Sequence, residues 1–428
     1  MHAEVRTDVN PDAIGIPEVP EYLALPPTGL GAPLTAGQQD LLDLVRSFAD
    51  GHVRPTGTLL DRLEPAEVIA ADSPLWPFLR TFGELGVTAS TIMQLPPDEL
   101  PVLLPALWEE LGAADAGLAI TIGAGMLPSL MMTAWGRRDL LEKYPESLLG
   151  CWAITEPDHG SDMLDADGAA FHAEGDYGQP NLVAVRKGDR IVLDGHKSAW
   201  VSNGCIAQVA ILYTACDEGD GPRPGMVLLV PLDREGVSRG RPLDKLGQRS
   251  LNQGEIFFDG VELEPELVLA GPDQYQGAVY SILAEANASM GAVFTGVARE
   301  AYGLALAYAH TRRQGGVPII RHQNVRARLF HMFRRVELAR SLARQVFLHN
   351  LTHPVPALQG SIASKITSTR IAFEVADDAL QIFGGNGLSR EYPMEKLLRD
   401  ARASLIEDGC NELLAIKGGS RLVDPSLL

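Results

Sequence analysis

The sequence is poor in cysteine, and it has no long apolar run. Its four cysteines, Cys151, Cys205, Cys216 and Cys410, form no C-x-x-C pair, which argues against a zinc site and against a disulfide framework. No stretch of about 18 consecutive apolar residues occurs, and the first residues (MHAEVRTDVNPD) lack the basic-then-apolar pattern of a secretory signal. These absences predict a cytoplasmic protein with reduced thiols and no membrane-spanning segment.

Basic residues are also scarce relative to acidic ones. The 36 lysines and arginines stand against 55 aspartates and glutamates, which gives a formal net charge of -19. Binding to nucleic acid depends on clustered lysines and arginines, so this balance argues against nucleic acid as a partner. Hydrophobic residues are plentiful, at 46% of 428 residues, and a chain of this length can bury the cores of two or three structural units.

The first part of the chain changes character near residue 36. Residues 1–35 are rich in proline with little periodicity, which is typical of an extended N-terminal arm. From 36 to 150 apolar residues recur at helical spacing, beginning with Leu41, Leu42 and Val45 after a Thr35 that could cap a helix. These patterns predict an N-terminal helical domain over residues 36–150.

The remaining chain divides into a β-like part and a second helical part. Over 151–271, short apolar runs such as Val209–Tyr213 and Met226–Val230 are separated by Gly, Asp and Pro turns, which predicts a small middle β-barrel or sandwich domain. Over 272–428, the helical period returns in four long stretches, at 277–312, 321–351, 359–383 and 391–416, which predicts a C-terminal four-helix bundle. The predicted fold class is therefore α+β.

The most specific motif is Thr155-Glu156-Pro157-Asp158-His159-Gly160-Ser161-Asp162, at the start of the β-like part. Its hydroxyls and glycine-freed amides are able to hydrogen-bond a heterocycle or a phosphate, although a capped turn with no ligand has the same composition. It resembles the T-E-P-x-x-G-S-D signature of the acyl-CoA dehydrogenases, and the resemblance extends from about Leu41 to Leu422. The family's domain order is the order predicted above.

The resemblance implies an FAD site around this motif. Thr155 should bond the flavin ring and Ser161 the FAD pyrophosphate, with Gly160 between them in the turn. The preceding Trp152 and Ile154 fit the family's hydrophobic lead-in, whose backbone faces the flavin ring.

A second segment, Gly195–Gly204, resembles the family's G-x-K-x-W-I-[ST]-N-G. An indole two residues before a hydroxyl places both on one face of a strand, so we expect Trp200 to pack against the flavin and Ser202 to reach its N5 edge. Further along, Lys245–Ser250 and Phe257–Val261 resemble the segments that close the family's β domain. We assign these two segments no catalytic role.

Two segments of the helical part resemble residues that complete the FAD site of a neighbouring subunit. Arg312 matches the first arginine of R-x-x-F-G, which pairs with the FAD diphosphate, although Gly315 replaces the phenylalanine. Gln381, Gly384, Gly385 and Gly387 match the Q-x-x-G-G-x-G loop that contacts the same diphosphate. A homodimer or homotetramer is therefore implied. His349 and His353 have no third ligand beside them, so no metal site is expected.

The expected catalytic base is a carboxylate near the end of the chain. Counting without gaps from Arg399-Asp400, Asp408 occupies the position of the glutamate in the family's E-G-T stretch, and Glu407 stands beside it as the alternative. Aspartate is shorter than the family's glutamate by one methylene. The substrate would therefore have to lie closer to Asp408, or Glu407 would have to act as the base instead. Glu285 lies one residue from the base position that other members use, but an exposed helix carboxylate is the preferred explanation of this residue.

The implied reaction is removal of hydrogen from the α and β carbons of an acyl thioester. The acyl group would be carried on coenzyme A or on an acyl-carrier protein, FAD would accept the hydride, and an electron-transfer flavoprotein or similar acceptor would reoxidise the flavin. An oxygen-using oxidase or monooxygenase of the same fold, and a non-catalytic acyl-carrier-binding scaffold, are the alternatives. The segment 163–194 is about fourteen residues longer than the family pattern and borders either the substrate entrance or plain surface.

Overall fold

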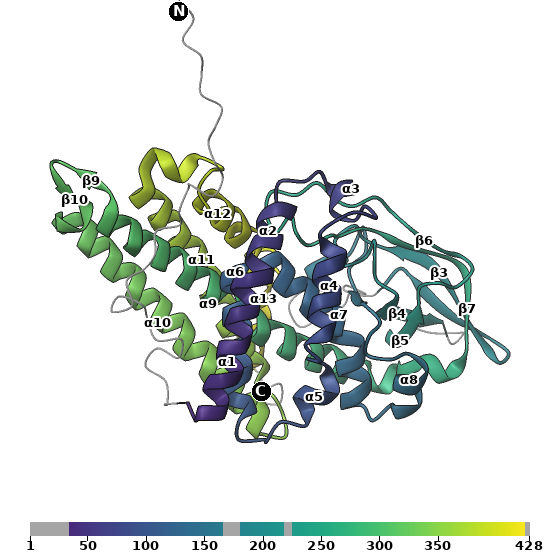
Figure 1. Ribbon diagram of the computed structural model, residues 1–428. Coiled ribbons are helices and arrows are strands. Elements are labelled where there is room, and N and C mark those ends of the chain that lie inside the picture. The colour runs from purple at the N-terminus through teal and green to yellow at the C-terminus, as the bar shows by residue number, and fades with distance from the viewer. Residues whose placement is uncertain (1–33, 166–179, 218–224, 424–428) are drawn as a thin grey trace, which may run out of the picture.

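The computed structural model describes residues 34–165, 180–217 and 225–423, which form helices, then a sheet, then helices again. In Figure 1 the N-terminal helices lie between the sheet on one side and the long C-terminal helices on the other. The predicted α+β fold class is thus confirmed. The proposed N-terminal arm up to residue 33 and most of the long segment after Met163, with His172, lie outside the described residues.

From residue 34 to the sheet the structure describes eight α-helices, and the first begins where the sequence predicts it. Thr35 and Gln38 form a reciprocal capping box, in which the Gln38 N–H donates to Thr35 Oγ1 at 3.2 Å and the Thr35 N–H donates to Gln38 Oε1 at 2.9 Å. The helices are α1 (Ala36–Phe48), α2 (Arg54–Leu60), α3 (Pro65–Val68), α4 (Leu75–Glu84), α5 (Ala89–Met93), α6 (Leu100–Ala114), α7 (Ala116–Ala134) and α8 (Arg138–Lys143).

Helix α7 is long and apolar enough to cross a membrane by length and composition alone. In the fold, 67% of its apolar window is buried, because α7 packs against α6 and against the strand that begins the β domain. The apolar character of α7 is therefore that of a core helix in a soluble protein.

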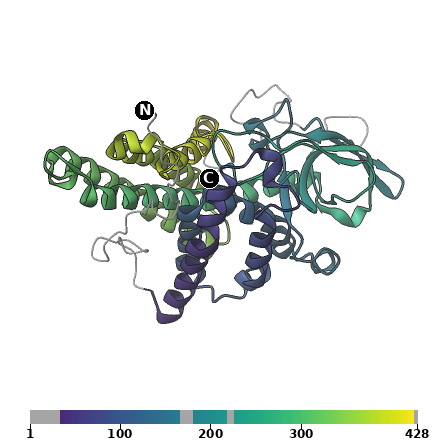
Figure 2. The same ribbon diagram turned by 45° about the horizontal axis from the view of Figure 1, so that its top comes forward.

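In the part of the β domain that the structure describes, eight strands form one strongly curved sheet. The strands are β1 (Gly150–Ala153), β2 (Val183–Lys187), β3 (Arg190–Lys197), β4 (Val209–Asp217), β5 (Gly225–Pro231), β6 (Val237–Arg239), β7 (Ile256–Leu263) and β8 (Val268–Ala270). Their order is β6-β7-β3-β2-β4-β5-β8, with β1 parallel to β4. Figure 2 shows the sheet curling around its own core. Because no pairing joins β6 to β8 among the described residues, the sheet is barrel-like but open, which refines the predicted barrel.

Over residues 275–423 the structure describes three long α-helices and two shorter ones. They are α9 (Tyr275–Thr311), α10 (Gln323–Thr352), α11 (Leu358–Phe383), α12 (Met394–Ala403) and α13 (Asn411–Val423). The prediction of a single helix over 391–416 is wrong. Asp408 and Gly409 have φ angles of 50° and 89°, in the left-handed region that a right-handed helix cannot contain, and the chain turns there.

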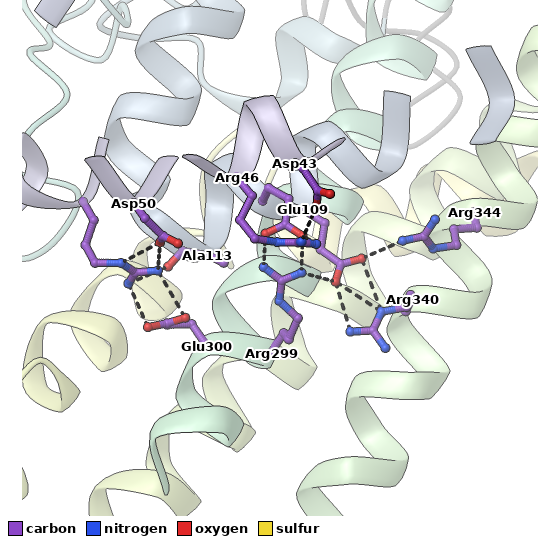
Figure 3. A network of polar contacts seen from close by, with 11 residues as sticks. Asp43, Arg46, Asp50, Glu109, Ala113, Arg299, Glu300, Arg340 and Arg344 are labelled. Atoms are coloured by element: carbon purple, nitrogen blue, oxygen red, sulfur yellow. Dashed lines mark hydrogen bonds and ion pairs between the residues drawn. The ribbon is translucent and has the colours of Figure 1, made fainter. Parts of the chain in front are cut away.

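A buried ion network fastens the N-terminal helices to the C-terminal ones (Figure 3). Glu109 of α6 accepts hydrogen bonds from Arg299 of α9 at 3.1 Å, from Arg340 of α10 at 3.0 Å and from Arg344 of α10 at 3.1 Å. The Arg340 and Glu109 side chains are only 1% and 3% exposed. Burial alone would raise the pKa of the adjacent Glu110, but the charges of Arg299 and Arg46 lower it to about 2.

Candidate active site

The turn Thr155–Asp162 follows β1 directly, and a buried ion pair holds it in place. Glu156 Oε1 lies 2.6 Å from Lys197 Nζ, with both side chains at most 1% exposed. The same ammonium donates to the Ile154 carbonyl at 3.0 Å, and Glu156 also accepts the backbone N–H of Leu182 at 3.2 Å. Burial lowers the pKa of Lys197 to about 8, against the charge of Glu156. A buried pair with this many additional hydrogen bonds fixes the conformation of the turn.

The two hydroxyls predicted to bind the cofactor are half-buried at the ends of this turn. Thr155 Oγ1 lies 2.8 Å from Ser198 Oγ, and the Ser198 N–H donates to the Thr155 carbonyl at 2.9 Å. Ser161 Oγ accepts the backbone N–H of Cys410 at 3.0 Å. This last bond brings the turn against the segment that carries Glu407 and Asp408.

Trp200 and Ser202 do not lie on a strand, so that prediction is wrong. Strand β3 ends at Lys197, Trp200 lies in the turn that follows, and Ser202 makes only an isolated bridge to Gln253. The chain leaves the strand directly after Lys197, where the Ser198 N–H donates to the Thr155 carbonyl, and the φ of 62° at Asn203 turns it again after Ser202. The indole of Trp200 is nevertheless 62% exposed, and Ser202 Oγ accepts from Gln253 Nε2 at 3.3 Å.

Four buried polar atoms near the start of the β domain have no hydrogen-bond partner among the described residues: Thr121 Oγ1, Trp152 Nε1, Asn203 Oδ1 and Asn252 Nδ2. Trp152 stands in β1, three residues before Thr155, and packs edge-on against Tyr213 with ring centroids 6.3 Å apart. Buried polar atoms without partners are rare in folded proteins. An unsatisfied indole N–H, an exposed indole and two accessible hydroxyls suit a flat, polar heterocycle that bears a phosphate chain, as FAD does.

The candidate bases lie in the turn between α12 and α13, where both carboxylates are half-buried. Burial, followed by the charge of Asp408, raises the pKa of Glu407 to about 8. Gln248 Nε2 donates to Glu407 Oε1 at 2.5 Å. Burial raises the pKa of Asp408 to about 6, against the lowering charge of Lys365. At neutral pH the Asp408 carboxylate is thus ionised and the Glu407 carboxyl is largely protonated.

Backbone strain also gathers at this site. Within the described ranges, the non-glycine residues with positive φ are Asn203 at 62°, Gln248 at 51° and Asp408 at 50°. Gln248 hydrogen-bonds Glu407, and Asn203 follows Ser202. Such conformations cost about 1–3 kcal/mol each and cluster at active sites and ligand clamps. Two of the three, Gln248 and Asp408, lie at the turn that carries the candidate bases, which supports a functional site there.

Comparison with known proteins decides the family. Residues 151–261 match the model of the acyl-CoA dehydrogenase middle domain, and residues 277–422 match that of the acyl-CoA dehydrogenase C-terminal domain. This chain belongs to the acyl-CoA dehydrogenase family. The family assignment, and with it the prediction of an FAD-dependent acyl-thioester dehydrogenase, is confirmed at this level.

Full-length relatives of this acyl-CoA dehydrogenase family member agree in both sequence and structure. The probable acyl-CoA dehydrogenase YngJ of Bacillus subtilis is 28% identical and covers 89% of this chain and 96% of its own length. Cyclohex-1-ene-1-carbonyl-CoA dehydrogenase of Geobacter metallireducens is also 28% identical, over 92% of this chain and 99% of its own. The structure of butyryl-CoA dehydrogenase from Megasphaera elsdenii superposes with a TM-score of 0.79 at 25% identity, covering 92% of this chain and 100% of that one.

The remaining predicted cofactor residues of this family member lie elsewhere in the fold. Arg312 is exposed at the end of α9, beside the short hairpin β9 (Arg313–Gln314) and β10 (Val317–Pro318). The glycine loop joins it there, because Asn386 Nδ2 donates to Tyr308 Oη at 3.0 Å. Figure 1 places β9 and β10 at the end of the molecule opposite the sheet.

The glycine loop itself is a short 3-10 turn over Gly384–Leu388. Gly384 has a φ of 61°, ends α11 and, like Gln381 and Gly385, is exposed, whereas Gly387 is buried. Arg312 and this loop are therefore brought together with each other but not with Thr155 and Ser161 of the same chain.

Sequence reasoning missed two residues that contact the base-bearing turn. Gln248 lies in a segment assigned only to the fold, and nothing in the sequence marks its left-handed backbone. Lys365 is a lysine within an amphipathic helix, yet it is fully buried against the turn. Glu285 lies on α9 with its side chain exposed, as an ordinary helix carboxylate, and Ser289 donates to it at 3.4 Å.

Proposed function

We propose that the protein is an FAD-dependent acyl-thioester α,β-dehydrogenase in which Asp408 takes the α-proton of the substrate. The observation that carries this proposal is the hydrogen bond from the Cys410 N–H to Ser161 Oγ at 3.0 Å. It brings the turn expected to bind the flavin against the turn that carries two carboxylates, from segments about 250 residues apart in sequence. A base must lie next to the cofactor for this reaction, because the α-proton and the β-hydride leave adjacent carbons.

Asp408 rather than Glu407 suits the role of base. A pKa of about 6 leaves Asp408 ionised at neutral pH and still basic enough to accept a carbon-bound proton. The Glu407 carboxyl, with a pKa of about 8, is largely protonated there, and Gln248 already holds one of its oxygens. The left-handed backbone at Asp408 also aims this side chain differently from a residue within a helix.

The chain's own residues can prepare the α-proton for removal. Among the described residues none accepts a hydrogen bond from the N–H of Asp408, so this amide is free to bind the thioester carbonyl. A donor at that oxygen stabilises the enolate-like charge that develops as the proton leaves. FAD, when bound, supplies the acceptor for the hydride of the β-carbon. Trp152, Ile154, Thr155, Gly160, Ser161, Trp200 and Ser202 would hold the flavin half of FAD.

The dehydrogenase would act on thioesters of coenzyme A or of an acyl-carrier protein, in the cytoplasm, with an electron-transfer flavoprotein or similar acceptor as electron partner. The test is anaerobic titration of the purified, yellow protein with a panel of saturated acyl thioesters. At least one thioester should bleach the flavin absorbance without oxygen. Bleaching by none, together with rapid reaction of the reduced flavin with oxygen, would favour the oxidase alternative; absence of flavin would favour the scaffold alternative.

The separation of Arg312 from the flavin turn supports a site shared between subunits. In a homodimer or homotetramer, Arg312, Gln381, Gly384, Gly385 and Gly387 of one chain would meet the FAD diphosphate held by its neighbour, where a guanidinium pairs with phosphate oxygens. Within one chain the two groups are apart: β9 and β10, next to Arg312, lie at the end of the molecule away from the sheet, whereas the flavin turn follows β1 and contacts the turn at Cys410.

Mixed oligomers test this sharing. Arg312→Ala should lose FAD affinity in both sites of a dimer, and Asp408→Asn should lose the base in both. Co-expressed and randomly paired, the two variants should regain about a quarter of the wild-type sites, since each mixed dimer has one intact site. The unsorted population would be assayed by single-turnover flavin bleaching. No recovery, or full FAD content in Arg312→Ala alone, would contradict a shared site.

A further inference from the structure

A buried lysine lies beneath the turn that carries the two carboxylates. Lys365, in the middle of α11, is 0% exposed. Its Nζ donates to the Gly409 carbonyl at 2.8 Å and to Asn411 Oδ1 at 2.9 Å. Lysine is almost never fully buried in proteins without a charged or strongly polar environment that stabilises it. No role for this residue follows from the motifs that identify the family.

We propose that Lys365 is a positioning residue for the catalytic base: its ammonium fixes the backbone of the 404–410 turn and keeps the Asp408 carboxylate ionised at the pH of catalysis. The inference rests on the proposed role of Asp408. It deepens that role by naming the group that makes an aspartate competent where the family usually has glutamate.

The first half of the proposal is geometric. Gly409 has a φ of 89°, and a Cβ at this position would lie 2.9 Å from both Leu164 and Leu414 side chains, so the turn passes through a narrow gap. The Lys365 ammonium, on α11, donates to the Gly409 carbonyl. The backbone N–H of the next residue, Cys410, donates to Ser161 Oγ. The turn is thereby held from α11 on one side and from the flavin turn on the other.

A second layer of hydrogen bonds fixes the ammonium itself. Asn411 Nδ2 donates to Thr369 Oγ1 at 3.1 Å, and Thr369 Oγ1 donates to the Lys365 carbonyl at 2.8 Å. Lys365, Thr369 and Asn411 are therefore joined by a closed ring of hydrogen bonds between α11 and the start of α13. Their side chains have little rotational freedom, which is what precise orientation of a neighbouring group requires.

The second half of the proposal is electrostatic. The groups whose charge acts on the Lys365 ammonium are Asp408, Glu407, Cys410 and Glu412, in that order of strength. Lys245, from the segment before β7, acts on Glu407, while α9 presents the uncharged Thr295 hydroxyl to Ser368 of α11. Lys365 is the cation that lowers the pKa of Asp408, against burial. A positive charge near a carboxylate favours its ionised form, so loss of that charge would leave burial unopposed.

The test compares the pH dependence of flavin reduction in Lys365→Gln, Lys365→Met and Lys365→Arg. The rate of anaerobic reduction by a saturated acyl thioester should fall on the acidic side as Asp408 becomes protonated. Removing the charge, in the Gln and Met variants, should move this fall to higher pH by about 1–3 units. The Arg variant keeps the charge and should stay within about half a unit of wild type. Exchange of the substrate α-proton in D₂O should show the same shifts, because it does not depend on the hydride step.

Lys417→Met is the matched control, because Lys417 is also a buried lysine of this domain, 4% exposed and paired with Asp165 at 2.7 Å. Its profile should match that of wild type. The proposal is overturned if Lys365→Gln and Lys365→Met fold, as judged by circular dichroism, and their rates of flavin reduction fall at the same acidic pH as the wild-type rate. If Lys365→Met does not fold, the comparison is made between Lys365→Gln and Lys365→Arg. A fully active Asp408→Asn variant would instead show that Asp408 is not the base. The failure of the proposed function can thus be told apart from the failure of the proposal for Lys365.

Discussion

Replacement of Asp408 by asparagine is expected to lower the rate of flavin reduction by an acyl thioester by about 10²–10⁴-fold, the usual contribution of a positioned general base. Asparagine has the same shape but cannot take the α-proton. The FAD content of this variant should be that of wild type, because among the described residues Asp408 forms no hydrogen bond or ion pair with those proposed to hold the cofactor. Stopped-flow measurement of the absorbance decay under anaerobic conditions gives the rate directly.

Two companion variants sharpen this test. Asp408→Glu restores the side chain that the family usually has at this position and should keep most of the wild-type rate. Glu407→Gln removes the second carboxylate but retains a group that Gln248 can bind, so its rate should fall far less than that of Asp408→Asn. A larger loss in Glu407→Gln than in Asp408→Asn would assign the base to Glu407 and contradict our reading of the site.

Arg340→Met is expected to destabilise the protein by about 3–5 kcal/mol, the cost of breaking a buried ion pair by removing one partner. Arg340 donates to Glu109 at 3.0 Å and pairs with Glu337, and it is only 1% exposed. Removing the guanidinium leaves the Glu337 carboxylate buried without its cation, while Glu109 keeps Arg299 and Arg344. Urea denaturation followed by circular dichroism measures the loss.

Arg370→Met is the matched control for this variant. Arg370 pairs with Glu374 at 3.0 Å, but it is 63% exposed, and such surface pairs contribute about 0–1 kcal/mol. Adding Glu337→Gln to Arg340→Met should recover part of the stability, because it removes the orphaned charge. Equal losses in Arg340→Met and Arg370→Met would show that the network of Figure 3 does not fasten the helices as we infer.

The sequence predicts the order of the domains and the flavin turn because both depend on local patterns. Helical and strand periods extend over a few residues, and Thr155–Asp162 is a contiguous motif whose turn residues and hydroxyls are visible in the sequence. The contact between Ser161 and Cys410 does not depend on a local pattern, because it joins segments that are far apart in the sequence. Only the resemblance to a family, and not the pattern of residues, indicates that these segments meet.

The turn at Asp408, the burial of Lys365 and the position of Trp200 could not be predicted from the sequence, because each depends on tertiary contacts. Ile406, Glu407 and Asp408 fit a helical period, and an aspartate with a left-handed backbone looks the same in sequence as one inside a helix. Lys365 sits in an amphipathic stretch, where a lysine is normally exposed. Its burial depends on the turn that packs over it, which is a tertiary contact. The departure of Trp200 and Ser202 from a strand is likewise set by tertiary hydrogen bonds, from Ser198 to Thr155 before them and from Asn203 to Thr121 and Asn252 after them.

The most direct test of the central claim is a single anaerobic turnover in which flavin bleaching and product are measured together. The protein would be mixed with a slight excess of the thioester that bleaches it, quenched, and analysed by mass spectrometry. The account predicts one product per flavin reduced, an α,β-unsaturated thioester that is lighter than the substrate by two hydrogens, and no such product from Asp408→Asn. A product that contains added oxygen, or that forms only when oxygen is present, would contradict it.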